Sequence, residues 1–183
     1  MFWTPLGYLS QRQAKEQELF RVWIEEEHMI GVEGPVVNYH HVAEDIAALA
    51  GEFDIQAIAF DPARMNLLKP ELEEFGVEVP FEKHQQGFIS MGPVVDLLAE
   101  MVLSRRLIHN NPVLTSNVAN AIVVGPDAAG NLKIDKGRSN DRSPVRVDGA
   151  VCLAMALGIA STWEAPEAKP SLDGFLRAPI MVI

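Results

Sequence analysis

Two aspartates, Asp61 and Asp148, lie at the edges of apolar segments, where a carboxylate could do chemistry. Asp61 ends the run of residues 55–61 and precedes Pro62, and Asp148 lies near the head of residues 145–157. An acid at the edge of a buried element is costly unless something pairs with it. In α/β proteins, ligands and metals collect at the carboxyl ends of strands. Two such acids, if they converge, would form an oxygen-rich site for Mg²⁺ or Mn²⁺, which metal-assisted phosphodiester hydrolysis requires.

Each aspartate also has a purely structural interpretation. An aspartate that precedes proline is common at the start of a helix, so Asp61 could be a helix cap. Asp148 could cap a helix in the same way, because an apolar helical pattern follows it. The residues alone therefore leave capping and metal binding open for both acids.

The composition limits the class of protein. The chain has 183 residues, with 15 Lys and Arg against 25 Asp and Glu, which gives a net charge of −10. The length suggests one domain with a real core, and so acidic a chain does not look like a stand-alone nucleic-acid binder. No apolar run is long enough to span a membrane, and the N-terminus lacks the features of a signal peptide. The single cysteine, Cys152, is expected to be buried in a helix and indicates a reducing, cytosolic setting.

The elements that must position the two acids follow from hydrophobic periodicity and from breaker residues. Helices are expected over residues 10–20, 41–52, 62–75, 91–104, 112–120 and 148–160. Strands are expected over residues 55–60, 77–81, 106–109, 121–124 and 132–134, with a hairpin turn at 127–131 and a loop at 136–144. Ser10 could cap the first helix, and Pro93 is expected in the first turn of the helix at 91–104. This alternation predicts an α/β fold with at least one parallel strand pair.

A series of short motifs runs along the chain in a specific order. The motifs are Trp23 before a turn, the strand ending in AFDPARM, Gln86-Gly87, His109, Asn111-Pro112, Asn120, Gly130-Asn131, Lys136 and Asp148-Gly149. No single motif is specific. The series, from about Thr4 to Ala160, resembles the nuclease domain of the large terminase subunit of tailed bacteriophages, the ATP-driven motor that packages and cuts viral DNA.

The resemblance implies a fold and a domain organisation. It implies a ribonuclease H-like fold, with a mixed sheet flanked by helices, over residues 1–160, followed by an extended tail at 161–183. In the family, the first acid of the metal site lies on a strand upstream of the segment that matches Trp3 to Leu9. We therefore expect a partial domain that lacks its first strand or strands and also the ATPase domain, since no GxxxxGK[ST] motif is present. An exposed strand edge of this kind also leads us to expect a homodimer.

The resemblance also implies a chemistry. Asp61 and Asp148 would be the second and third acids of a site that holds two Mg²⁺ or Mn²⁺ ions and cleaves concatemeric duplex DNA. Because the first acid is missing, the fragment is expected to bind metal weakly and to be weak or inactive. The implied partners are double-stranded DNA, the ATPase domain, the small terminase subunit and the portal, in the cytoplasm of the bacterial host.

Several other side chains could serve this site. Lys136, Arg138 and Arg142 form a basic cluster with Lys133 and could contact the DNA backbone, although a solvated loop is the simpler interpretation. His109 could carry a proton or contact phosphate, or it could be structural. The acidic groups at residues 25–27 and 71–74 are expected to be solvated helix faces.

Two alternatives come from other classes of protein. The chain could be a folded but non-catalytic prophage remnant, or a docking module that contacts the ATPase domain or the portal. Its net charge of −10 motivates this alternative. A small-molecule phosphate enzyme is disfavoured, because the sequence lacks a Gly-rich phosphate loop.

Overall fold

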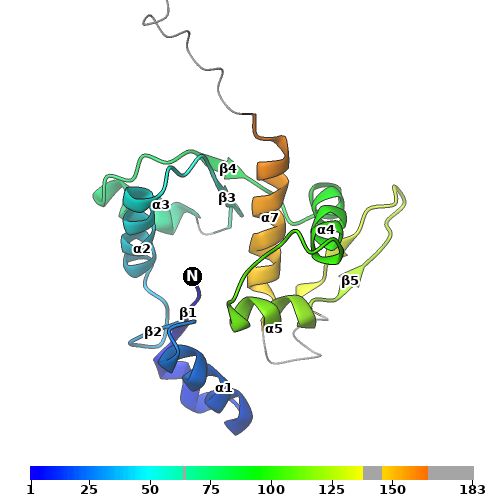
Figure 1. Cartoon of the computed structure of the whole chain (residues 1–183). Coiled ribbons are helices and arrows are strands. Elements are labelled where there is room, and N and C mark those ends of the chain that lie inside the picture. Colours follow the sequence, from blue (N-terminus) through cyan, green and yellow to red (C-terminus); the bar gives the residue numbers. More distant parts are fainter. Residues whose placement is uncertain (64, 138–145, 165–183) are drawn as a thin grey trace, which may run out of the picture.

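Helices and three small, separate two-stranded sheets make up the computed structural model (Figure 1), which describes residues 1–63, 65–137 and 146–164. The expected α/β class and the expected parallel strand pairs are confirmed, because two of the three sheets are parallel. The sheets do not join into the single mixed sheet that we expected, since each described strand pairs with only one neighbour. Within the described residues, no helix is both long and apolar enough to cross a membrane.

The N-terminal part of the chain forms the first parallel pair. Strand β1 (Trp3–Pro5) pairs with β2 (Ile30–Val32), and the connection holds the 3-10 helix η1 (Leu6–Gln11) and helix α1 (Ala14–Glu25). Neither strand was predicted. The expected cap at Ser10 was wrong, because residues 6–11 form the 3-10 helix and Gln13 is the N-cap of α1.

The second parallel pair lies between two packed helices and the rest of the molecule. Helix α2 (Tyr39–Glu52) packs against α3 (Met65–Glu74), and β3 (Ile58–Phe60) pairs with β4 (Phe81–Lys83). Gly76 ends α3 with a φ of 65°, a left-handed conformation that glycine adopts without strain. The strand expected at 77–81 begins only at Phe81, so the residues that pair with β3 lie further along the chain than the apolar pattern indicated.

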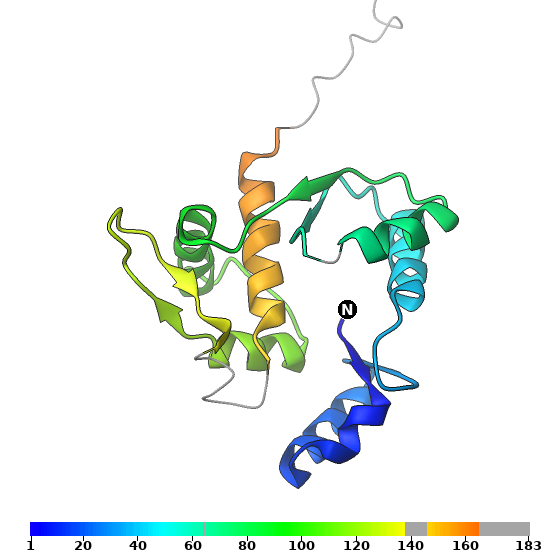
Figure 2. The same ribbon diagram turned by 180° about the vertical axis from the view of Figure 1, so that it is seen from behind.

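The main core lies around α7 (Asp148–Thr162), which packs against α4 (Phe88–Leu103) and α5 (Pro112–Asn120), as the reverse view shows (Figure 2). Strands β5 (Val123–Val124) and β6 (Lys133–Ile134) form the predicted antiparallel hairpin beside it. Buried residues of α4, β6 and α7 form one cluster: Met91, Val94, Val95, Leu98, Ile134, Val147, Ala150, Val151, Ala154 and Met155. This core fixes where α7 begins, and therefore where Asp148 lies.

Three further expectations were wrong. Residues 106–109 are not a strand: Ile108 is 92% exposed, and no neighbouring strand pairs with this segment. Pro93 lies inside α4 rather than in its first turn, because the helix already begins at Phe88. Cys152 is exposed rather than buried, since it lies on the side of α7 that faces away from the main core.

Candidate metal centre

Asp61 directly follows β3, in the connection that leads to α3. Its Oδ1 accepts a hydrogen bond from the backbone N–H of Ala63 at 2.8 Å, as in an Asx turn. The side chain therefore helps to shape this connection, but the expected helix cap at Asp61 was wrong, because α3 begins only at Met65. A carboxylate has about four lone-pair sites, so one such bond leaves capacity for a metal ion.

Asp148 is the first residue of α7, and the start of this helix is held by another helix. The backbone N–H of Gly149 donates a hydrogen bond of 2.8 Å to Oδ1 of Asn117, which is 3% exposed. The side-chain amide of Asn117 in turn donates to the carbonyl of Val113 within α5. The N-cap of α7 is Val147 rather than Asp148, so the expected capping role of Asp148 was wrong. Its carboxylate lies instead in the first helical turn, where negative charge is favourable.

Gly149 is required by close contact with the N-terminal segment. A Cβ at this position would lie 2.6 Å from Cε1 of Phe2, a distance that side-chain carbons do not tolerate. The same Cβ would also crowd Oδ1 of Asn117 at 3.1 Å. The residue after Asp148 is therefore fixed by packing, and this gives a structural reason for the Asp148-Gly149 pair.

Lys136 lies beside Asp148. Its Nζ is 3.0 Å from Oδ1 of Asp148, and the two side chains are 40% and 63% exposed. Exposed ion pairs contribute little to stability, so the main consequence is electrostatic. The positive charge of Lys136 therefore faces this carboxylate directly.

Cys152 lies one helical turn after Asp148, and the charges of Asp148 and Lys136 affect the pKa of its thiol. Burial of part of the thiol by surrounding protein raises its pKa, although the residue as a whole is exposed. Lys136 and the chain's N-terminal amine lower this pKa, and Asp148 raises it. The thiol is therefore a neighbour of the Asp148–Lys136 pair, which the sequence did not indicate.

The other predicted site residues are only partly placed. Lys133 lies with its Nζ 4.6 Å from the ring centroid of Phe88, a cation–π contact that joins β6 to the start of α4. His109 is exposed and lies outside any strand. Arg138 and Arg142 fall outside the described residues.

The two aspartates do not form a larger cluster of potential metal ligands. Strand β3 contacts α7, but the pocket between the segment leading into β3 and this helix is lined by the last turns of α7, at the opposite end from Asp148. Within residues 1–63, 65–137 and 146–164, the one group of three or more His, Cys, Asp or Glu ligand atoms within 4.8 Å of one another is elsewhere, at His40, Glu71 and Glu74. Sequence analysis missed this group. Its only sequence signal was a histidine at a helix start and two glutamates three positions apart.

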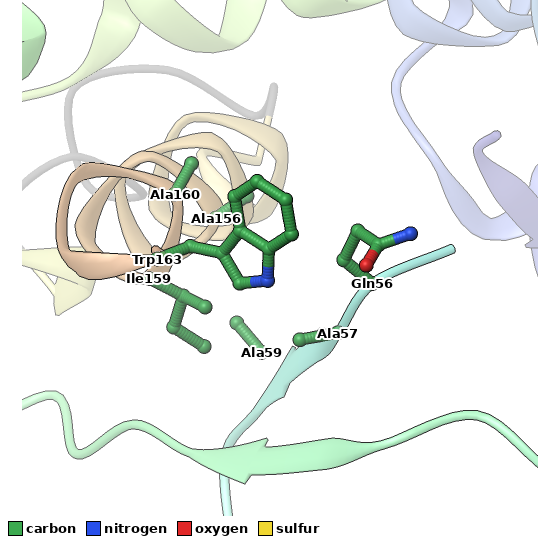
Figure 3. Close-up of a pocket in the computed structure, with 7 residues that line it drawn as sticks. All are labelled: Gln56, Ala57, Ala59, Ala156, Ile159, Ala160 and Trp163. Carbon is green, nitrogen blue, oxygen red and sulfur yellow. The ribbon is translucent and has the colours of Figure 1, made fainter. Parts of the chain in front are cut away.

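A small pocket lies at the far end of α7 from Asp148. Its volume is about 230 Å³, and it lies between the segment leading into β3 and the last turns of α7 (Figure 3). The lining residues are Gln56, Ala57, Ala59, Ala156, Ile159, Ala160 and Trp163. None of these side chains is an acid, a base or a nucleophile, so the pocket does not supply hydrolytic chemistry.

Several residues of the motif series have structural roles. Trp23 is 4% exposed in a second core cluster with Phe20, Met29 and Val113. Asn111 caps α5 by accepting a bond from the N–H of Leu114 at 3.1 Å.

The hairpin turn depends on a carboxylate. Oδ1 of Asp127 accepts hydrogen bonds from the backbone N–H of Asn131 at 2.8 Å and of Ala129 at 2.9 Å. The backbone and then the side-chain amide of Asn131 lower the pKa of Asp127 below its ordinary value of 3.8. The Gly130-Asn131 motif and Asp127 therefore form the hairpin turn that the sequence predicted at 127–131.

Comparison with known proteins gives a consistent result. Residues 2–164 match the family model described as terminase large subunit, endonuclease domain. The terminase large subunit of Enterobacteria phage HK97 is 36% identical over 180 residues, covering 98% of this chain and 34% of that protein. The terminase large subunit of Lactococcus phage SK1 is 26% identical over 157 residues, covering 82% of this chain and 28% of that protein.

A solved structure is also similar. The crystal structure of the HK97 bacteriophage large terminase matches with a TM-score of 0.75 and 38% sequence identity. The match covers 85% of this chain and 32% of that one. The chain therefore spans about a third of the length of the relatives that it matches.

Proposed function

The chain belongs to the family of terminase large subunit endonuclease domains, and on this premise we propose that it is the metal-dependent DNA-cutting part of a phage packaging motor. The observation that carries the proposal is the placement of Asp148 at the start of α7 with Lys136 beside it. An exposed, rigidly positioned acid offers oxygen ligands to a metal ion, and the lysine beside it would contact the phosphate that this ion binds. A ribonuclease H-like fold is part of the same proposal.

Asp61 and Asp148 would hold the divalent ions. Both are hard oxygen donors, and the 63% exposure of the Asp148 side chain leaves room for a hydrated Mg²⁺ or Mn²⁺. When bound, the two ions would supply an activated water and neutralise the charge on the leaving oxygen. The cations of the chain would position DNA: Lys136 beside the metal site, with Arg138, Arg142 and His109 as further contacts to the phosphate backbone.

The rest of the motor would hold most of the DNA. A net charge of −10 is unfavourable for binding a polyanion, so the basic surface must come from elsewhere. We propose the ATPase domain, the small terminase subunit and the portal as partners, acting in the cytoplasm of the bacterial host. Pairing of this chain with a second copy remains a prediction.

A second candidate function is a non-catalytic docking module. Apolar side chains at the end of α4 and after it favour it, because Leu103 is 84% exposed and Ile108 is 92% exposed. Large exposed apolar side chains that lie close together often mark a protein interface.

The test is cleavage of supercoiled plasmid by the chain in Mn²⁺ or Mg²⁺. We expect slow nicking and linearisation, abolished by Asp148→Asn and by Asp61→Asn. Asp54→Asn is the matched control, because this exposed aspartate lies before β3, at the opposite end from Asp61. Cleavage that survives both site substitutions would contradict the proposed site. Absence of both cleavage and Mn²⁺ binding by the wild-type chain would favour the docking module.

A further inference from the structure

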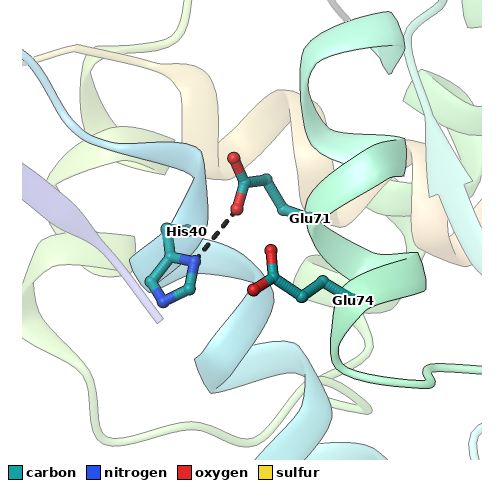
Figure 4. A group of neighbouring side chains, drawn as sticks. All are labelled: His40, Glu71 and Glu74. Carbon is teal, nitrogen blue, oxygen red and sulfur yellow. Dashed lines mark hydrogen bonds and ion pairs between the residues drawn. The ribbon is translucent and has the colours of Figure 1, made fainter.

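Three side chains from two packed helices point toward one another, away from the proposed nuclease site (Figure 4). His40 is the second residue of α2, and Glu71 and Glu74 lie about one turn apart on α3. Nδ1 of His40 is 3.0 Å from Oε2 of Glu71. One ligand atom from each of the three side chains lies within 4.8 Å of the other two.

The scaffold around His40 holds its imidazole in place. Oδ1 of Asn38 accepts a hydrogen bond from the backbone N–H of His40 at 3.0 Å, which caps α2 and fixes the backbone at this residue. The ring of Phe75 lies against the imidazole, with 5.0 Å between the ring centroids. Residues three apart on a helix share a face, so the spacing of Glu71 and Glu74 directs both carboxylates toward α2.

An ordinary ion pair does not account for all three residues. It explains the contact between His40 and Glu71, whereas the exposed Glu74 brings a third ligand atom to the same point. Two carboxylates this close repel each other unless positive charge lies among them. A dication would remove that repulsion, and its charge would equal that of the two carboxylates.

The donor set also suits a transition-metal dication. Zinc bonds to histidine nitrogen and carboxylate oxygen are about 2.0–2.2 Å long, which places tetrahedral ligand atoms about 3.4 Å apart. The contact of 3.0 Å between His40 and Glu71 is close to that spacing, and small side-chain rotations would bring in Glu74. Imidazole suits Zn²⁺ and similar ions, whereas Mg²⁺ prefers oxygen ligands alone.

We propose that His40, Glu71 and Glu74 bind one Zn²⁺-type ion that joins α2 to α3. Three protein ligands leave a fourth position for water. This site differs from the one at Asp61 and Asp148 in its donors, since the latter offers only carboxylate oxygens. The two sites are therefore separable by substitution of their own ligands.

Calorimetric titration of the purified chain with ZnCl₂ tests the proposal, and thermal unfolding gives a second readout. We expect one Zn²⁺ ion per chain and a melting temperature that rises with Zn²⁺. His40→Ala and Glu74→Gln should each weaken the binding at least tenfold and remove the thermal shift. Asp148→Asn should leave both unchanged, so failure at this site is distinguishable from failure of the proposed nuclease site.

Two neighbouring residues provide matched controls. His41 and Glu73 are adjacent to the cluster but outside it, and Glu73 pairs with Lys69 instead. His41→Ala and Glu73→Gln should bind Zn²⁺ like the wild-type chain. The proposal is overturned if the wild-type chain binds no Zn²⁺ at millimolar concentration. It is also overturned if His41→Ala loses binding as His40→Ala does, or if Glu74→Gln, with an unchanged far-UV circular dichroism spectrum, binds normally.

Discussion

The ammonium group of Lys136 lies 3.0 Å from Oδ1 of Asp148, at the first residue of the most central helix of the molecule. The contact links a carboxylate that the proposed function assigns to metal binding with a cation that it assigns to DNA. In the absence of metal and DNA, these two groups satisfy each other. A metal ion that binds Asp148, or a DNA phosphate that binds Lys136, must then displace this ion pair.

Removing the cation should therefore strengthen metal binding. We expect Lys136→Met to tighten the binding of Mn²⁺ about fivefold, since the repulsion between the two positive charges costs on the order of 1 kcal/mol near a solvated surface. Lys133→Met is the matched control, because it removes the same charge from a lysine that lies over the ring of Phe88. The measurement is a calorimetric titration at low salt. Equal effects of the two substitutions would indicate general electrostatics rather than a local competition.

The thiol of Cys152 should report on the same charges. Because Asp148 raises the pKa of this thiol, Asp148→Asn should lower that pKa and speed alkylation by iodoacetamide at pH 8. Saturating Mg²⁺ should speed alkylation of the wild-type chain for the same reason. The chain has one cysteine, so the rate is assigned without ambiguity. A Mg²⁺ effect that persists in Asp148→Asn would show that the ion binds elsewhere.

The start of α7 should depend on Asn117. Replacement by alanine leaves the buried N–H of Gly149 without its acceptor, a cost of about 1–3 kcal/mol. Urea unfolding measures this cost as a loss in the free energy of unfolding. Asn120→Ala is the control, since among the described residues that side chain bonds to Ser116 within α5. An equal loss in both variants would contradict the capping role of Asn117.

The turn at Asp127 should be sensitive to acid. Hydrogen bonds from Asn131 and then from the neighbouring backbone lower its folded-state pKa below 3.8, so the turn gains stability from the carboxylate above that pH. This gain is lost as the pH falls through the lower, folded-state pKa. We expect Asn131→Ala to raise the pKa of Asp127, because it removes the side-chain amide, but to leave it lowered, because the backbone bond remains. Carboxyl NMR titration measures this pKa, and no change in the variant would contradict the assignment.

Long periodic segments were predictable from the sequence, and short ones were not. The apolar patterns of α5 and α7 placed their first residues correctly at Pro112 and Asp148. Strands β1 and β2 escaped notice because three residues are too few to show alternation. Residues 106–109 show the converse, since an apolar pattern becomes a strand only where a partner strand is present.

The candidate site was partly predictable for a similar reason. Asp148 stood out because a charged residue at the edge of an apolar run is uncommon. Asn117 and the cluster at His40 did not stand out, because their partners are 31 or more positions away in the chain. Contacts of this kind depend on how the helices pack, which local patterns do not encode.

The central claim is that Asp61 and Asp148 share a divalent metal ion. Paramagnetic broadening of amide NMR signals by Mn²⁺ tests it most directly, in a His40→Ala background that removes the second proposed site. We predict selective broadening of signals around both Asp61 and Asp148, reversed by excess Mg²⁺ and absent in the Asp148→Asn variant of the same background. Broadening around only one of the two aspartates, or around neither, would contradict the account.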